Sequence, residues 1–415
     1  MSPPVTTTSH TSFERYTGTP KLMVPAFAVG ILGLLATLGG FFATSAKGET
    51  AHAYLIGFTY WVGISIAFLI MQAIFHTAKA KWLIVLRRTM ETASAVIPVF
   101  FVLALPLLAM AAYLYPWWEG SSLTQGYSSL ELEHLSHKQH GYLNNHLSFP
   151  PGVGVRHIIY FGLWSFAAWR LRTWSLKQDT EGGLDFTIKQ RKFSPGVLPF
   201  LALTITFASF DWLMSLTPLW QSTIFGVYYF AGSFLAAFCI LTIVTVNAQG
   251  KDLYGSLVKL DHFHNLGKLM LAFTAFWAYI AFSQFLLVWI ANIPEEAPWY
   301  GLRIFGAWRP LSIALFFLHF VLPFGVLLSR KLKLQPRKLA VVAVYLLVIH
   351  AVDLYWLVWP ALSGDAGPTF HWSLLTAFFG VGGIAVGTAL LLARGQYTLT
   401  VKDPYIAESL RYVQP

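Results

Sequence analysis

Protonatable side chains stand inside long apolar runs of this sequence. Asp211 lies in the stretch ASFDWLMSLTPLW, two thirds of the way along an apolar run that begins near Pro195. An ionised carboxylate at the middle of a bilayer costs on the order of 2.5 to 3.5 kcal/mol, so such a residue either has a function or is protonated and hydrogen-bonded. The functions that suit it are proton transfer and contact with a quinone. The structural alternative is a protonated acid that bonds a neighbouring serine or a backbone carbonyl.

A second acid, Asp353, is expected at a similar depth in a later apolar run. His350 precedes it by three residues, so both side chains can share one face of a helix. The aspartate could then orient the imidazole while the other ring nitrogen meets water or a substrate, although a purely structural pair is equally compatible. The other polar residues expected in this outer layer are Tyr228, Tyr229, Gln284 and His319.

A separate polar layer is predicted near the opposite membrane face. His76 ends one apolar run, Glu91 begins the next, and Arg87 and Arg88 stand just before Glu91. Arg87 and Glu91 are four residues apart and can pair on one helical face. This layer is either an ion pair that anchors the helix or a place of proton uptake, because histidine titrates near physiological pH.

The composition places these residues in a membrane. Of the 415 residues, 56% are hydrophobic and only 11% are charged, which is outside the range of soluble globular proteins. Ten runs are long enough to cross a bilayer, so the predicted fold is an all-α polytopic membrane protein. The runs cover residues 22–44, 54–77, 92–115, 156–174, 196–217, 223–247, 268–291, 311–329, 339–359 and 373–393.

The basic residues predict the orientation of the chain. With the N-terminus inside, 23 of the 28 Lys and Arg residues fall in cytoplasmic segments, as the positive-inside rule requires. Both termini are therefore expected in the cytoplasm, and the net charge of +10 reflects topology and not nucleic-acid binding. The predicted organisation is a cytoplasmic tail (1–21), a membrane domain (22–393) and a second cytoplasmic tail (394–415). The first 20 residues lack the features of a secretory signal, so the first helix is expected to be retained.

The predicted helices fall into two sets of four. Helices two to five and helices six to nine each begin and end outside, which is the topology of a parallel repeat. The last helix of each set carries one acid, because Asp211 follows Pro195 by 16 residues and Asp353 follows Leu339 by 14. At a rise of 1.5 Å per residue, both acids would lie roughly 20 to 25 Å from the cytoplasmic face.

The sequence supports a redox centre within this chain less well than it supports proton transfer. His319 and His350 could face each other as the ligands of a transmembrane haem do, but buried histidines are more often hydrogen-bonded core residues. The single cysteine, Cys239, cannot hold an iron–sulfur cluster or attach a c-type haem. No Walker loop, dinucleotide fingerprint or nucleophile elbow is present, which disfavours ATP-driven and hydrolytic chemistry.

The longer outer loop contains several histidines in the stretch EHLSHKQHGYLNNH. His134, His137 and His140 are spaced by three residues, and His146 follows. This spacing can gather metal ligands on a helix, yet no cysteine or carboxylate cluster completes a recognisable site. A polar loop that faces a partner is therefore the preferred interpretation.

Three stretches resemble a known family of membrane proteins. They are RRTMETAS (residues 87–94), DWLMSLTPLWQSTIFGVYYFAG (211–232) and HNLGKLMLAFTAFWAYIAFSQFLLVWIANIPEEAPWY (264–300). They resemble the NrfD/PsrC-type membrane subunits, and most closely the ActF type of alternative complex III. The resemblance covers roughly residues 20–395.

The resemblance implies two four-helix bundles, helices two to five and six to nine, flanked by one helix at each end. It implies a subunit of a quinol oxidoreductase in a bacterial inner membrane, with cytochrome c or a blue-copper protein as electron acceptor. Iron–sulfur clusters and c-type haem are expected in partner subunits, and a sister NrfD/PsrC-like subunit is the favoured site of quinol oxidation. The ActF type is often described as a second subunit that binds menaquinone or ubiquinone, and it is suspected of carrying protons. By this resemblance, Asp211 corresponds to the acid that precedes tryptophan in the family. Arg87, Arg88 and Glu91 correspond to the family's motif near the inner membrane face.

The leading hypothesis is a proton-conducting membrane subunit that binds no cofactor covalently and performs no catalytic step itself. Protons would pass between an inner layer of His76 and Glu91 and an outer layer of Asp211, His350 and Asp353. Asp211→Asn is then expected to leave assembly intact and to lower proton transfer per electron. Two alternatives are a structural scaffold with silent buried acids and an independent secondary transporter.

Overall fold

The structure is a computed structural model that describes residues 15–17, 20–144, 152–250 and 257–413. It is all-helical: 79% of it is helix, and the residues described contain no β-strand. His146 of the histidine-rich loop lies outside the described residues.

The helical elements follow one another along the whole chain, joined by short turns and a few longer loops. They are α1 (Pro20–Ala43), α2 (Lys47–Thr77), η1 (Lys81–Leu86), α3 (Arg87–Ser94), α4 (Ile97–Leu114), α5 (Ser129–His140), α6 (Val153–Glu181), α7 (Asp185–Trp212), η2 (Met214–Leu216), α8 (Phe225–Gly250), α9 (Leu260–Ala291), α10 (Ala297–Ile304), α11 (Arg309–Leu315), η3 (Phe316–Val321), α12 (Leu322–Leu328), α13 (Arg330–Lys333), α14 (Pro336–Val358), α15 (Pro360–Ser363), η4 (Gly364–Ala366), α16 (Ser373–Ala393) and α17 (Ile406–Leu410).

The long apolar helices make the chain a multi-pass membrane protein. Among the described residues, nine helical segments are long and apolar enough to cross a bilayer. The remaining predicted run, 156–174, is also helical and forms part of α6, but it is not among these nine. Arg156 near the start of α6, and Arg170 and Arg172 in its second half, add charge to that helix. A count of ten crossings therefore stays a prediction.

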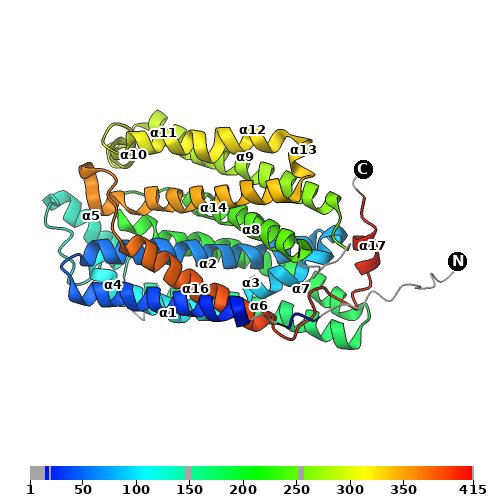
Figure 1. Cartoon of the computed structure of the whole chain (residues 1–415). Coiled ribbons are helices and arrows are strands. Elements are labelled where there is room, and N and C mark those ends of the chain that lie inside the picture. Colours follow the sequence, from blue (N-terminus) through cyan, green and yellow to red (C-terminus); the bar gives the residue numbers. More distant parts are fainter. Residues whose placement is uncertain (1–14, 18–19, 145–151, 251–256, 414–415) are drawn as a thin grey trace, which may run out of the picture.

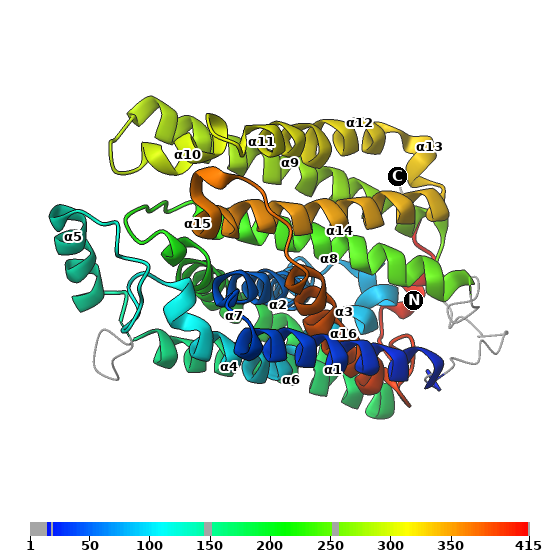
Figure 2. The same cartoon turned by 60° about the vertical axis from the view of Figure 1, so that its left-hand side comes forward.

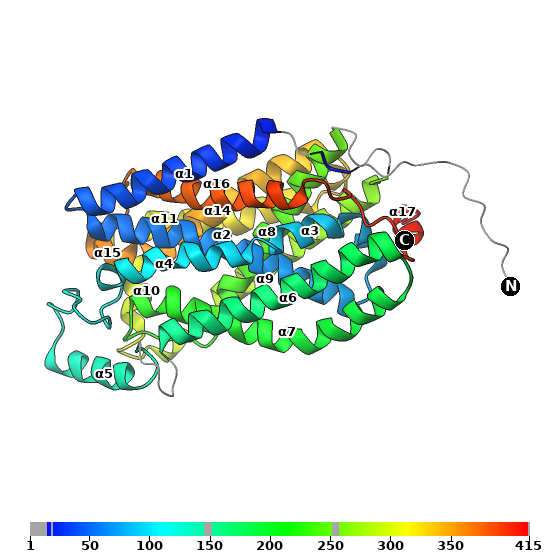
Figure 3. The same ribbon diagram turned by 90° about the horizontal axis from the view of Figure 1, so that it is seen from below.

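The helices run side by side and define two ends of the molecule (Figure 1). One end, called here the α17 end, holds α17, η1 and the bridge that pairs Arg15 with Tyr397. The other, called here the α5 end, holds α5, α10 and α15, and α5 stands apart from the bundle there (Figure 3). The first described residues and the C-terminal segment therefore lie at the same end.

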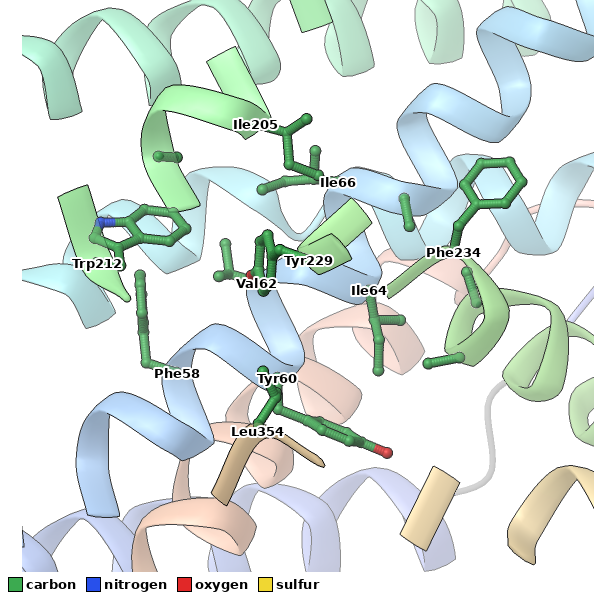
Figure 4. Close-up of a cluster of buried hydrophobic side chains, with 14 of the residues drawn as sticks. Phe58, Tyr60, Val62, Ile64, Ile66, Ile205, Trp212, Tyr229, Phe234 and Leu354 are labelled. Atoms are coloured by element: carbon green, nitrogen blue, oxygen red, sulfur yellow. The ribbon is translucent and has the colours of Figure 1, made fainter. Parts of the chain in front are cut away.

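Helix α2 is the centre of the molecule, because nearly all of its side chains are buried. It packs against α4, α7, α8 and α16, while α8 in turn packs against α9 and α14 (Figure 2). Close packing in the core joins side chains from several of these helices (Figure 4). The labelled residues are Phe58, Tyr60, Val62, Ile64 and Ile66 from α2, Ile205 and Trp212 from α7, Tyr229 and Phe234 from α8, and Leu354 from α14.

Glycines allow α1 and α16 to approach each other closely. A Cβ atom on Gly383 would lie 2.5 Å from the backbone nitrogen of Gly30, and one on Gly33 would lie 2.6 Å from the carbonyl oxygen of Thr376. Small residues in this spacing are a common way to pack helices in lipid, where backbones must meet without a hydrophobic driving force. The outer faces of both helices remain exposed, as expected for helices at the edge of a bundle in a bilayer.

Helix α5 begins with a capping box that can be tested directly. The Ser128 hydroxyl accepts a hydrogen bond from the Glu131 backbone N–H at 3.3 Å, and the Glu131 carboxylate accepts one from the Ser128 backbone N–H at 2.7 Å. These bonds lower the pKa of the Glu131 carboxyl. The stabilisation is therefore present above the unfolded pKa and is lost as the pH falls through the lower folded value.

Ser128→Ala should accordingly destabilise α5 locally, because it removes the hydroxyl that accepts from the Glu131 backbone N–H. At neutral pH, the amides of the first turn of α5 are expected to exchange with deuterium about fivefold faster than in the unmodified chain. Ser136→Ala, later in the same helix, is the control and should leave these amides unchanged. Equal exchange in the Ser128→Ala chain and the unmodified chain would show that the cap does not hold the helix.

Candidate functional site

The polar layer predicted around Glu91 is a buried cluster of five charged side chains at the α17 end. Arg87 Nε lies 3.1 Å from Glu91 Oε1, and Arg88 Nη1 lies 2.8 Å from Glu91 Oε2. The first contact is an ion pair that is not aligned as a hydrogen bond. The pairing expected from the four-residue spacing is thus present, and Arg88 shares the same carboxylate.

Two further acids complete this cluster, and neither was predicted. Asp403, in the C-terminal segment, accepts a hydrogen bond from Arg87 at 2.7 Å, and Asp179 of α6 accepts one from Arg88. The two arginines therefore face three carboxylates, all buried. Buried ion pairs are stable only when good geometry and additional hydrogen bonds offset the cost of desolvation. Here Gln178 and Ser175 supply such additional bonds by accepting from Arg87.

His76 lies beside this cluster, in the last turn of α2. It lines a cavity of about 30 Å³ together with Gln72, Arg87 and Asp403. The carboxylate that shares the cavity with His76 is therefore Asp403, and Glu91 does not line this cavity. A cavity of this size holds one or two water molecules.

Asp211 forms the polar centre of the α5 end in the first half of the chain. It lies in the last turn of α7, which ends at Trp212. Its carboxylate accepts two hydrogen bonds from Arg156, at 2.9 Å from Nε and 2.6 Å from Nη2, and a third from the Tyr160 hydroxyl at 2.9 Å. The Arg156 guanidinium also lies 3.9 Å from the centre of the Tyr142 ring. Asp211 is therefore a fully paired carboxylate with a cation that balances its charge.

Arg156 was not predicted as a partner, although the sequence contains a signal for it. The α6 and α7 helices form an antiparallel hairpin around Gly182 and Gly183, which both adopt positive φ. Arg156 precedes Gly183 by 27 residues and Asp211 follows it by 28. Two residues that are equally far in sequence from the turn of a helical hairpin lie at the same level along the two helices. The pairing of Arg156 with Asp211 could therefore have been predicted from their equal separations from these glycines.

Asp353 has a different environment at the same end of the molecule. The Tyr228 hydroxyl of α8 donates to Asp353 Oδ1 at 2.5 Å, and His350 Nδ1 lies 3.9 Å from Oδ2. Among the described residues, no lysine or arginine lies within 4 Å of the Asp353 carboxylate. The sequence predicts similar positions for Asp211 and Asp353. The structure distinguishes them, because Asp211 pairs with Arg156.

His350 and His319 lie next to each other with buried, unpaired ring nitrogens. Their ring centres are 6.4 Å apart, and the His319 ring contacts the Trp277 ring at a tilt of 35°, with ring centres 3.8 Å apart. In the described structure, neither nitrogen of either ring has a hydrogen-bond partner. Buried polar atoms without partners are rare and usually mark bound water, an ion or a functional site. His319 also lies in the π-helical turn η3, a distortion that is frequent at functional sites.

Two residues predicted to support this layer make bonds that join helices. The Tyr229 hydroxyl of α8 donates to the Thr59 carbonyl of α2 at 2.6 Å. Gln284 of α9 donates to the Tyr300 hydroxyl at 3.0 Å and accepts from the Ser222 hydroxyl at 3.2 Å. Neither of these bonds involves Asp353.

A buried cation, Arg303, was also missed by sequence analysis. It lies in α10, 3.5 Å from the centre of the Trp299 ring, and donates to the Leu357 carbonyl at 3.1 Å. Burial lowers the pKa of the guanidinium to about 9, so it remains protonated at neutral pH. No periodic pattern in the sequence points to Arg303, because α10 lies in a loop between two long apolar runs.

An apolar layer separates the two polar ends. Tyr60, which packs on His350, and His76 are 16 residues apart on α2, or roughly 24 Å along the axis. Val62, Ile66 and Leu69 lie between them and are fully buried. A proton that moved from one polar end to the other would therefore need water in addition to these side chains.

In the part of the chain that is described, no group of three or more His, Cys, Asp and Glu side chains is arranged to hold a metal ion. His140 of α5 uses its Nδ1 in a 2.7 Å contact with the Ser136 carbonyl oxygen. Cys239 is a free, buried cysteine in α8.

Comparison with known proteins does not identify a family for this chain. No model of a known protein family matches the chain, and no curated protein sequence matches it. The fold and its polar clusters define the chain as a multi-pass helical membrane protein with buried acids and histidines.

Proposed function

We propose that this chain is the proton-conducting membrane subunit of a quinol oxidoreductase of the NrfD/PsrC type, close to the ActF type of alternative complex III. The observation that carries the proposal is Asp353, a buried carboxylate with no adjacent lysine or arginine among the described residues. It accepts from Tyr228 and lies beside His350, whose ring nitrogens have no hydrogen-bond partner within the described ranges. A carboxylate without a fixed counter-charge can bind and release a proton with little rearrangement, whereas a carboxylate held by arginine stays ionised.

The proposed topology has ten crossings of a bacterial inner membrane with both termini in the cytoplasm. Packing supports a division into two bundles: α2, α4, α6 and α7 pack together in the first, and α8, α9, α12 and α14 do so in the second. Helices α1 and α16 then flank the bundles as a pair. In this orientation the α17 end faces the cytoplasm, which agrees with the basic residues of α13 and η1 at that end.

The proposed path has two chemical stages. At the cytoplasmic end, His76 and Asp403 border a small cavity that can hold water, and Glu91 lies behind Arg87. At the outer end, Asp353 and the two histidines receive the proton. Iron–sulfur clusters and c-type haem belong to partner subunits, and quinol oxidation belongs to a sister membrane subunit. Contact between this chain and quinone stays a secondary prediction.

A scaffold function is the second candidate, and the paired charges favour it. Arg156 with Asp211, and the two arginines with their three acids at the α17 end, are saturated ion clusters that could serve only to hold helices together. Under this alternative, Glu91→Gln changes stability and leaves quinol turnover and proton transfer as they were. An independent transporter, the third alternative, requires that the chain act without partners.

Purification of the tagged full chain in mild detergent tests the assignment to a redox complex. Iron–sulfur and c-type haem subunits are expected to co-purify in fixed ratio, and the reduced-minus-oxidised visible spectrum should show haem bands. An unrelated polytopic protein with the same tag provides the control. A colourless chain without partners would contradict the proposal and favour the transporter.

A further inference from the structure

A large cavity at the α5 end adjoins the Asp211 cluster, because Tyr142, which packs on Arg156, forms part of its lining. Its volume is about 660 Å³, and it lies between the end of α7, the loop that leads into α8, and the last turns of α9, with Lys138 of α5 on one side. This volume is within the range of small-molecule binding sites, which is about 300 to 1,000 Å³. The cavity can therefore hold a lipid headgroup and the first part of an acyl chain.

The walls of this cavity are mainly apolar and continue onto the outer surface of two membrane-spanning helices. Phe207 of α7 is 40% exposed and Leu287 of α9 is 63% exposed, and both line the cavity. Phe210 and Val288 lie deeper on the same helices. Because exposed apolar side chains of spanning helices face the hydrocarbon of the bilayer, a chain from the membrane can enter from the side.

The rim of the cavity supplies hydrogen-bond donors and one acid. Lys138 Nζ donates to the Pro218 carbonyl at 2.6 Å, and among the described residues no carboxylate lies within 4 Å of it. Trp220 Nε1 is buried and has no hydrogen-bond partner in the part of the chain that is described. Glu296, from the loop after α9, lines the cavity as well. An ammonium group with only a carbonyl partner is a suitable site for an anion.

We propose that this cavity binds one membrane phospholipid, with its phosphate at Lys138 and an acyl chain along Phe207 and Leu287. Glu296 favours a headgroup that carries an amine, so phosphatidylethanolamine should bind better than phosphatidylglycerol. A neutral quinone ring would leave the Lys138 charge without a counter-ion. The inference does not rest on the proposed function.

Bound lipid is measured on the full chain, purified with its partners if it has them. After extraction, one phospholipid per chain is expected by mass spectrometry. Lys138→Gln should lower the retained phospholipid about fivefold, the loss expected when one cationic contact of roughly 1 kcal/mol is removed. Leu287→Trp should lower retention, because the larger indole narrows the side of the cavity that opens to the bilayer. The matched controls are Lys331→Gln and Val341→Trp, both exposed positions outside the cavity, and these should retain lipid like the unmodified chain.

Headgroup preference is tested by adding single lipids to the delipidated protein and recording native mass spectra. Phosphatidylethanolamine is expected to form the stronger complex, and Glu296→Gln should remove the preference. Thermal unfolding of every variant checks that each is folded. An isoprenoid quinone in place of phospholipid, or equal lipid in Leu287→Trp and Val341→Trp, would overturn the proposal. Equal binding of both headgroups by the unmodified chain would overturn the role of Glu296.

Discussion

Asp211→Asn is expected to lower the free energy of unfolding by about 3 kcal/mol, because it leaves Arg156 buried without a counter-charge. Both side chains of the pair are buried, and the carboxylate accepts two bonds from the guanidinium and one from Tyr160. The measurement is thermal or denaturant unfolding in detergent, with the folded fraction followed by size-exclusion chromatography. The result differs from the intact assembly expected from sequence alone.

The exposed pair between Lys81 and Glu408 is the control for this change. Its two atoms are 2.6 Å apart, but its side chains are 43% and 53% exposed. Lys81→Gln should therefore cost less than about 1 kcal/mol. The double variant Arg156→Met with Asp211→Leu should regain much of the lost stability, since no buried charge is left unpaired. If Asp211→Asn unfolds like the unmodified chain, the pair does not stabilise the fold and Asp211 again becomes a candidate for proton transfer.

Asp353→Asn is expected to leave the fold intact and to slow proton transfer through the chain on the order of 100-fold. The asparagine oxygen can still accept from Tyr228, and no buried cation is left without a partner, but the amide cannot bind and release a proton. The measurement is proton movement per electron during quinol oxidation by the complex in sealed vesicles. Unfolding in detergent, measured in parallel, should change little.

Asp365→Asn is the matched control, because Asp365 is an exposed acid at the same end of the molecule. It should leave both proton transfer and quinol turnover unchanged. Tyr228→Phe, which removes the donor to Asp353, is expected to give a smaller loss than Asp353→Asn. Unchanged proton movement in Asp353→Asn would exclude the proposed path and favour the scaffold function.

The positions of the helices could be predicted from the sequence because hydrophobic length is a local property. Each of the ten apolar runs is largely helical in the structure, although the run 92–115 is divided between α3 and α4. The run that contains Asp353 corresponds to α14. The pairing of Arg87 with Glu91 could also be predicted, since it depends only on spacing within one helix. Much of the helical structure can therefore be predicted from local sequence patterns.

The partners of the buried acids could not be predicted in the same way, because they depend on which helices pack together. Arg156 and Asp211 are far apart in the sequence and meet only through the α6 and α7 hairpin. Asp403 was assigned to a cytoplasmic tail, yet it is buried against Arg87. Hydropathy gives depth in the membrane but not neighbours, so it could not separate Asp211, which has a counter-charge, from Asp353, for which none is seen within 4 Å among the described residues.

The C-terminal segment has a consequence for how the protein is made. Arg87 and Arg88 are synthesised early, whereas Asp403 and Ser409 follow them by at least 315 residues. Asp403 pairs with Arg87, and the Ser409 hydroxyl accepts from the Val85 backbone N–H and donates to the Trp82 carbonyl. A chain that stops short of Asp403 would leave a buried arginine with one acid fewer. Formation of this cluster is therefore complete only after Asp403 has been synthesised, so chains that stop before Asp403 should be less stable in detergent than the unmodified chain.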